Sequence, residues 1–473
     1  MDRRQFFKVG AGSLTAGAIG ILAMPKFSDA FIKGGGLTIE EGLYILEKGK
    51  EKNIMPSVRP EILQNPKAVF IIETNVNVSP DKNGFFSDAS GELEVIGKKV
   101  VSDLFVKGSV KGGSTLIKPN FTTVPDTVLS PVVGINVSPY FTAGMYKGLQ
   151  EIGNTNVIFS DRGTDVLNHR KTGIYQVLDK YGINLIEANY EKFYNYGKNE
   201  INWYKVSNPY IWKNVPTYRP IGDKDNFFIN LAKLKCHNLG LTTLTIKNLQ
   251  GSVPSGYGQF CVSWGGLNIL AEDTLGMNFK RDFFSDYQER VESSFLKHKA
   301  QGFKYWDYEG LYPVYQSRGG WNAFKKINDN PDKANEFLKD LDVLMWDEQW
   351  CQRAIDSASA IKPSINIIEG VIGRDGSGFD TGKDELCNVV IAGLSPLEVD
   401  SVGSWIMGHD PKELFYTRIA KERGLGENDP EKIQIFKIAD GEIKPVKNLA
   451  EIKRYRLGVN LHTWKDTGKR LFW

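Results

Sequence analysis

The chain of 473 residues has only four cysteines, and no two of them form a CxxC pair. They are widely spaced, at Cys236, Cys261, Cys351 and Cys387. This spacing excludes the local motifs that are typical of iron–sulfur clusters and zinc ribbons. One or two disulfides are compatible with an oxidising compartment, and four buried thiols are the alternative.

The chain also lacks a strong net charge. Its formal charge is +3, and residues 1–30 contribute an excess of two basic groups, so the remainder is nearly neutral. Binding of nucleic acid or of an anionic membrane usually needs a basic face, so we expect neither as a partner. Beyond residue 24 no apolar run is long enough to cross a bilayer, so we expect no membrane span in the mature chain.

The first 30 residues have the order of a secretory signal peptide. Arg3 and Arg4 precede a mild apolar run over residues 9–24, and small residues place the cleavage site after Ala30. The arginine pair resembles the signal of the twin-arginine translocation (Tat) pathway, which exports folded proteins. We therefore expect the Tat machinery as a partner and a periplasmic or extracellular location. An uncleaved amphipathic helix is the alternative.

Short β-type runs alternate with helical ones from about residue 67. Strands are predicted at 69–73, 115–118, 156–160, 184–187, 364–370 and 388–392. Helices are predicted at 92–106, 141–152, 172–181, 396–407 and 411–423. This alternation predicts an α/β fold in which a mainly parallel sheet is flanked by helices.

Residues 252–360 have a different composition, rich in aromatic side chains, and end in a long helix predicted at 333–361. We interpret this segment as an aromatic-rich helical insertion or cap. The expected organisation is a signal peptide at 1–30, an extension at 31–66, an α/β domain formed by 67–251 and 361–436, the insertion at 252–360, and a C-terminal extension at 437–473.

Polar residues follow two of the predicted strands. Lys118 and Asn120 close one strand, and Asp161 closes another. Open parallel sheets bind ligands in the crevice at the carboxyl ends of their strands. We therefore expect these side chains to line a ligand site, with solvated turns as the alternative.

The densest group of reactive side chains lies at residues 235–247. Lys235 and His237 share a face if the stretch is extended, and Thr243 and Lys247 share one if their stretch is helical. Two ammonium groups and an imidazole suit the binding of an anion and the transfer of a proton. His237 is also a candidate metal ligand, with a hydrogen-bonded structural histidine as the alternative.

A third segment combines glycines at 370, 373, 376 and 378 with the carboxylates of Glu369 and Asp375. Glycines let the backbone approach a ligand closely. The segment matches neither the Walker pattern nor GxGxxG. Asp375, Asp380 and Asp384 suggest calcium but do not match the EF-hand positions, so a tight surface loop is the alternative.

Asp400 is predicted on the apolar face of a helix. A carboxylate there must be paired, hydrogen-bonded or protonated. It either orients a lysine of the site or caps neighbouring backbone groups.

Four segments, taken together and in this order, resemble the DUF362 family of uncharacterised proteins. They are Leu116–Asn120, Asn230–His237, Thr245–Gly251 with Asn248, and Ile391–Gly408 with Asp400. The resemblance spans about residues 67–430, interrupted by the aromatic segment. Cys236 stands where the family usually has threonine, and Glu369 where aspartate is common. The ferredoxin-like cysteine module of some relatives is absent, so the resemblance implies no iron–sulfur cluster.

The combined expectation is an exported protein with a crevice for a small anionic ligand. Lys235, His237 and Lys247 are the candidate catalytic residues, and a divalent metal is the cofactor considered. The candidate ligand-binding residues are Lys118, Asn120, Asp161, Asn248, Glu369, Asp375 and Asp400. The leading hypothesis is an enzyme of unknown reaction. A non-catalytic binding or assembly factor, with a partner surface on the aromatic segment, is the second hypothesis, and a protein that handles metal redox is the third.

Overall fold

The computed structural model describes residues 36–122, 124, 127–161, 170–188, 196–237, 240–254, 290, 293–294, 296–297, 341–376, 382–460 and 470–471. The predicted signal peptide, most of the aromatic segment, Cys261 and Asp380 lie outside the described residues.

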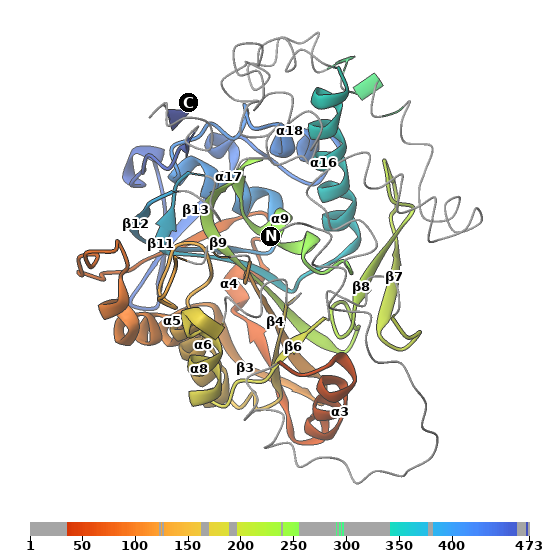
Figure 1. Ribbon diagram of the computed structural model, residues 1–473, viewed down its shortest axis with the longest axis vertical. Coiled ribbons are helices and arrows are strands. Elements are labelled where there is room, and N and C mark those ends of the chain that lie inside the picture. The colour runs from red at the N-terminus through yellow and green to blue at the C-terminus, as the bar shows by residue number, and fades with distance from the viewer. Residues whose placement is uncertain are drawn as a thin grey trace. The chain divides into compact units, whose positions relative to one another are not determined.

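A ten-stranded sheet forms the centre of the described chain (Figure 1). Its order is β14-β13-β2-β12-β11-β9-β4-β5-β6, and β10 also pairs with β9. The strands are β2 (Val69–Glu73), β4 (Ser114–Pro119), β5 (Val157–Asp161), β6 (Leu185–Glu187), β9 (Asn226–His237), β10 (Leu241–Thr243), β11 (Ile365–Arg374), β12 (Asp384–Gly393), β13 (Ile435–Ala439) and β14 (Glu442–Pro445). β10, β12 and β14 run antiparallel to their neighbours, and the other strands are parallel to one another. The predicted α/β class with a mainly parallel sheet is confirmed.

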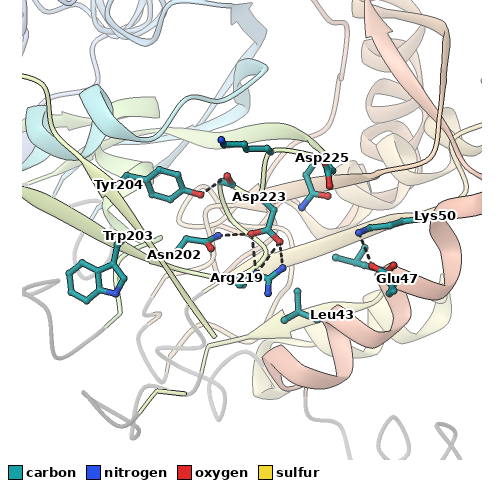
Figure 2. Close-up of a pocket in the computed structure, with 13 residues that line it drawn as sticks. Leu43, Glu47, Lys50, Asn202, Trp203, Tyr204, Arg219, Asp223 and Asp225 are labelled. Atoms are coloured by element: carbon teal, nitrogen blue, oxygen red, sulfur yellow. Dashed lines mark hydrogen bonds and ion pairs between the residues drawn. The ribbon is translucent and has the colours of Figure 1, made fainter. Parts of the chain in front are cut away.

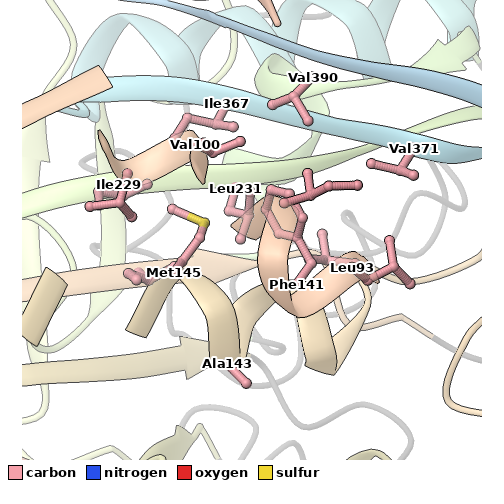
Figure 3. Packing of buried hydrophobic residues seen from close by; sticks show 14 of the residues in the cluster. Leu93, Val100, Phe141, Ala143, Met145, Ile229, Leu231, Ile367, Val371 and Val390 are labelled. Carbon is pink, nitrogen blue, oxygen red and sulfur yellow. The ribbon is translucent and has the colours of Figure 1, made fainter. Parts of the chain in front are cut away.

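One face of the sheet packs against α5 (Ser90–Leu104), α6 (Pro139–Glu151) and α8 (Ile174–Lys180). Figure 3 shows Phe141 and Met145 of α6 against Ile229 and Leu231 of β9. Ile229 and Leu231 lie on one face because alternate residues of a strand point the same way. Burial of these apolar side chains supplies the main favourable free energy of folding.

The opposite face packs against α3 (Ile39–Gly49), α9 (Thr245–Gln250) and α17 (Pro396–Ile406). Gly42 of α3 lies against Ile158 and Ile186, and Gly403 of α17 lies against Ile368. The residues that flank these isoleucines within their strands point to the other face of the sheet, toward α5, α6 and α8. The described chain therefore has three layers: helix, sheet and helix. Two more helices, α16 (Leu341–Ala360) and α18 (Phe415–Glu422), contact α9 and α17 from outside (Figure 1).

The remaining elements are short. Two-stranded sheets are formed by β1 (Ile54–Val58) with β3 (Phe105–Lys111), by β7 (Ile201–Lys205) with β8 (Asn214–Tyr218), and by β15 (Val459–Asn460) with β16 (Arg470–Leu471). α4 (Pro60–Leu63) is a single turn, and further short turns are 3-10 helices, η1 (Lys50–Lys52), η2 (Ser87–Ala89), η7 (Pro430–Lys432) and η8 (Leu449–Glu451). None of the helices in the described part of the chain combines the length and the hydropathy that a membrane crossing requires.

The structure differs from the predicted elements in a few places. The helix predicted at 411–423 begins only at Phe415, because residues 411–413 form turns. The helix predicted at 333–361 is described as α16, from Leu341. β13 and β14 continue the central sheet across the domain boundary that we expected at residue 436.

Gly144 permits the close crossing of α5 and α6. A Cβ added there would lie 2.0 Å from the carbonyl oxygen of Glu94, and one added at Gly97 would lie 2.1 Å from that of Phe141. We expect Gly144→Ala to lower the free energy of unfolding by about 1–3 kcal/mol, because the two helices must move apart. Urea unfolding followed by circular dichroism measures the change.

Gly91→Ala is the matched control, because Gly91 is also helical but nothing lies within 4 Å of an added Cβ. It should leave the stability unchanged or raise it by up to about 1 kcal/mol, from helix propensity. Equal stability of both variants would contradict the close crossing.

Candidate functional site

Lys118 forms a buried ion pair at the carboxyl ends of β4 and β5. Its side chain is almost wholly buried, and its Nζ lies 3.0 Å from Asp161 Oδ1. The same ammonium donates to Asn248 Oδ1 at 3.2 Å and to the Pro119 carbonyl at 3.1 Å. Removing a charge from water is costly unless it is paired and hydrogen-bonded, and here both conditions are met. The predicted neighbourhood of Lys118 and Asp161 is therefore present.

Asn248 ties α9 to two strands. Its Nδ2 donates to the Lys118 carbonyl at 3.2 Å and to Asn230 Oδ1 at 2.8 Å. Its Oδ1 accepts from Lys118 and, at 3.1 Å, from Nδ2 of Asn120. Gly251 follows α9, and a Cβ there would lie 2.8 Å from Lys118 Nζ, so glycine leaves the room that the ammonium occupies. These contacts bring together Lys118, Asn120 and Asn248, three of the candidate ligand-binding residues.

Lys235 near the end of β9 has a different environment from Lys118. Its side chain is 3% exposed, and its Nζ donates to the carbonyl oxygen of Ile135 at 2.6 Å. In the described part of the chain, no carboxylate forms an ion pair with it. Burial lowers the pKa of Lys235 well below its ordinary value, and the charges of Lys247, Lys233 and Arg374 lower it further.

His237 ends β9 on the same side as Lys235. It is buried, and burial with the charges of Lys247 and Lys235 lowers the pKa of its imidazole well below the ordinary value. Both effects favour the neutral form of the imidazole. The ammonium of Lys247 lies 6.0 Å from the ring centroid of Trp350 in α16. The structure thus brings the three candidate catalytic residues, Lys235, His237 and Lys247, into mutual electrostatic range.

Thr243 does not share a helical face with Lys247. It belongs to β10, where its register partner is Lys235, and α9 begins two residues later, at Thr245. The condition under which Thr243 and Lys247 would share a helical face is not met, because the backbone first returns along β9.

Glu369 pairs with a lysine that the sequence did not single out. It is the register partner of Lys233 on the parallel strands β11 and β9, and the two form a fully buried ion pair. Glu369 Oε1 also accepts from the Val371 amide at 3.0 Å, and its Oε2 accepts from the Ser138 amide at 3.4 Å. Lys233 lies two residues before Lys235, so strand periodicity alone could have placed it on the same face.

The carboxylates of Asp375 and Asp384 each interact with a residue of the same hairpin. Asp384 pairs with Arg374 at 2.8 Å, and Asp375 Oδ1 accepts from the Lys383 amide at 2.5 Å, which closes the loop between β11 and β12. Among the described residues no group of three potential His, Cys, Asp or Glu metal ligands is found. Asp375 therefore stabilises the loop between β11 and β12.

Asp400 of α17 caps α9. Its buried carboxylate accepts from the Thr245 amide at 2.7 Å and from the Ile246 amide at 3.1 Å, and also from the Thr245 hydroxyl. Tyr416 Oη lies 3.4 Å from Oδ2. Burial raises the pKa of Asp400 to about 7, although the hydrogen bonds oppose this shift. Of the two roles expected for Asp400, the contacts match the backbone cap.

The three described cysteines, Cys236, Cys351 and Cys387, are buried thiols. Cys236 Sγ lies 2.9 Å from the carbonyl oxygen of Leu457. Burial raises the pKa of Cys387 to about 12, so that thiol stays protonated at neutral pH.

A hollow of about 540 Å³ lies at the other end of β9, between α3, β7 and the turn before Asn226 (Figure 2). Arg219 and Asp223 form a two-pronged ion pair on one side, with Nη2 2.9 Å from Oδ2. Lys50 and Glu47 of α3 pair at 2.7 Å on the other side. None of the residues predicted for the site lines this hollow.

Comparison with known protein families gives a match. The family model described as "Domain of unknown function (DUF362)" matches residues 115–405, more than half of the chain. Every candidate site residue, from Lys118 to Asp400, lies inside the matched range. No curated protein and no solved structure matches the chain.

The pKa of Asp400 gives a testable pH dependence. Its folded value of about 7 lies above the ordinary 3.8, so the folded protein binds this proton more tightly than the unfolded chain does. The resulting stability is fully present below the ordinary pKa and is lost as the pH rises through about 7. We expect the free energy of unfolding to fall by up to about 4 kcal/mol across this range, relative to Asp400→Asn.

Urea unfolding of both proteins at several pH values measures this difference. Asparagine keeps an oxygen for the Thr245 amide but does not titrate, so other titrating groups cancel in the comparison. A difference in stability that is constant with pH would contradict the assignment.

Proposed function

The chain belongs to the DUF362 family, and we propose that it is an exported protein that binds a small anionic ligand at the carboxyl ends of β4, β9 and β11. The supporting observation is the buried amine of Lys235. Lys118, Lys233 and Arg374 each have a carboxylate partner, whereas the described partner of Lys235 is a carbonyl oxygen. A ligand anion beside Lys235 would offset the repulsion from the neighbouring cations and restore its charge.

The same side chains suit proton transfer. Lys235 and His237 lie on one face of β9, and their surroundings favour the neutral form of both groups. A neutral amine and a neutral imidazole are both proton acceptors, and an arriving anion favours their protonated forms. We therefore propose them as the acid and base groups if the bound ligand is also transformed. Lys118 lines the site as a fixed side chain, because Asp161 and Asn248 hold its ammonium in place.

Ligand binding is tested with Lys235→Met and His237→Gln. Methionine keeps much of the length of lysine without its charge, and glutamine keeps hydrogen-bonding groups without a titrating ring. The mature protein is titrated with inorganic phosphate, sulfate, malonate and citrate, and binding is followed by calorimetry and by the shift in melting temperature. We expect at least one anion to bind to the wild type and both variants to bind it at least about tenfold more weakly.

Lys111→Met is the control, because Lys111 is exposed on β3. It should bind as the wild type does. Unchanged binding in Lys235→Met and His237→Gln would overturn the proposal. Loss of the folded circular dichroism spectrum in both would instead assign the two residues to structure.

Export through the Tat pathway is tested on the full chain. Arg3→Lys with Arg4→Lys preserves the charge of the segment but removes the arginine pair, so we expect the protein to stay in the cytoplasm. Cell fractionation with immunodetection measures the distribution, and Lys8→Arg, which keeps the pair, is the control. Equal export of the double variant and the control would contradict a Tat signal.

A further inference from the structure

Asn136 presents a buried donor on the loop whose Ile135 carbonyl accepts from Lys235. Its side chain is fully buried, and its Oδ1 accepts from the Thr122 amide at 2.7 Å. Its Nδ2 has no hydrogen-bond partner in the described chain. Asn136 directly follows Ile135, whose carbonyl oxygen accepts a hydrogen bond from Lys235 Nζ. Buried polar groups are nearly always satisfied, so this donor calls for a partner that the protein does not supply.

Arg374 presents a second such donor on the neighbouring strand. It is the register partner of Lys235, and its Nη1 is bound to Asp384 at 2.8 Å. Its Nε is buried and has no hydrogen-bond partner among the described residues. A Cβ added at Gly134 would lie 2.9 Å from the Arg374 Cβ and 2.4 Å from the Gly373 carbonyl oxygen. The loop that carries Asn136 therefore lies directly against the end of β11.

β11 is irregular at this place. In its pairing with β9, Glu369 lies opposite Lys233, and the next paired residue, Arg374, lies opposite Lys235. An advance of five residues along β11 therefore corresponds to an advance of two along β9. Such bulges redirect a side chain at the end of a strand and are frequent beside active sites. Here the irregularity makes Arg374 the register partner of Lys235.

From this arrangement we propose that the site binds the phosphoryl group of a small phosphate or phosphate monoester, with Asn136 Nδ2, Arg374 Nε and Lys235 Nζ as its donors. The inference rests on the proposed anion site and names its ligand class. The three donors come from a loop, from β11 and from β9, and these segments contact one another through the Lys235–Ile135 hydrogen bond and the packing of Gly134 against Arg374. A phosphoryl group has three terminal oxygens spread around a tetrahedron, whereas a carboxylate has two oxygens in one plane.

Charge favours the same ligand. Lys247, Lys233 and Arg374 all act on Lys235 as positive neighbours. A phosphate monoester carries between one and two negative charges at neutral pH, so it offsets this repulsion more fully than a single carboxylate does.

Asn136→Asp tests the assignment with little change in shape. Aspartate keeps the oxygen that accepts from Thr122 but replaces the unpartnered donor with a negatively charged acceptor. Arg374→Lys keeps a positive charge opposite Asp384 and removes the Nε donor. We expect inorganic phosphate to bind the wild type, and each variant to bind it at least about tenfold more weakly, as measured by isothermal calorimetry.

Asn83→Asp and Arg418→Lys are the matched controls, because Asn83 is exposed and Arg418 lies on α18, in an exposed contact with Glu422. Both should bind phosphate as the wild type does. Glycerol 2-phosphate and malonate, a dicarboxylate whose carboxylate groups are each planar, are titrated alongside. Tighter binding of the two phosphate compounds than of malonate supports the phosphoryl assignment.

Two results would overturn the inference. One is binding of malonate, weakened by Lys235→Met, without binding of phosphate, and this result leaves the anion site itself intact. The other is phosphate binding that Asn136→Asp and Arg374→Lys do not change. If none of the tested anions binds to the folded wild type, the proposed anion site fails as well.

Discussion

The carboxyl edge of the central sheet depends on the hydrogen bonds of one amide, that of Asn248. It accepts from Lys118 and donates to the backbone of β4 and to Asn230 of β9, so one side chain joins a helix and two strands. α9 has only six residues, and a helix of that length is not stable alone in water. Its position is therefore fixed from outside, by Asn248 within the helix and by Asp400 at its start. Lys247 lies between these two anchors, and its place beside Lys235 and His237 depends on both.

Much of the sheet could be predicted because its strands are buried on both faces. Val69–Glu73 is an apolar run with almost every side chain buried, and its predicted bounds coincide with β2. The two-stranded sheets gave no comparable signal. β3 exposes most of its side chains, so its residues show no regular apolar period. β13 escaped prediction for another reason, because its place in the sheet is set by pairing with β2, more than 350 residues away in the chain.

The candidate site shows the same division between local and distant information. A period of two placed Lys235 and His237 on one face of β9, and the structure brings them together. The same period applies to Lys233, but its significance emerges only when β11 is known to lie beside β9 and to bring Glu369 against it. The roles of Asp400 and Asp375 likewise follow from backbone amides that no spacing reveals. Sequence thus located the chemical groups, and strand adjacency decided which of them are already neutralised by the protein.

The contact between α9 and α16 has a consequence for how the chain can vary. α9 precedes the aromatic-rich segment and α16 forms its last part, and the two helices pack against each other, with Lys247 near Trp350. The two points where that segment leaves and rejoins the body are thus held together by contacts of the body. A change in the number of residues between α9 and α16 therefore leaves the contacts that hold these two helices together unchanged, and the lysines and the histidine at the sheet edge stay in register.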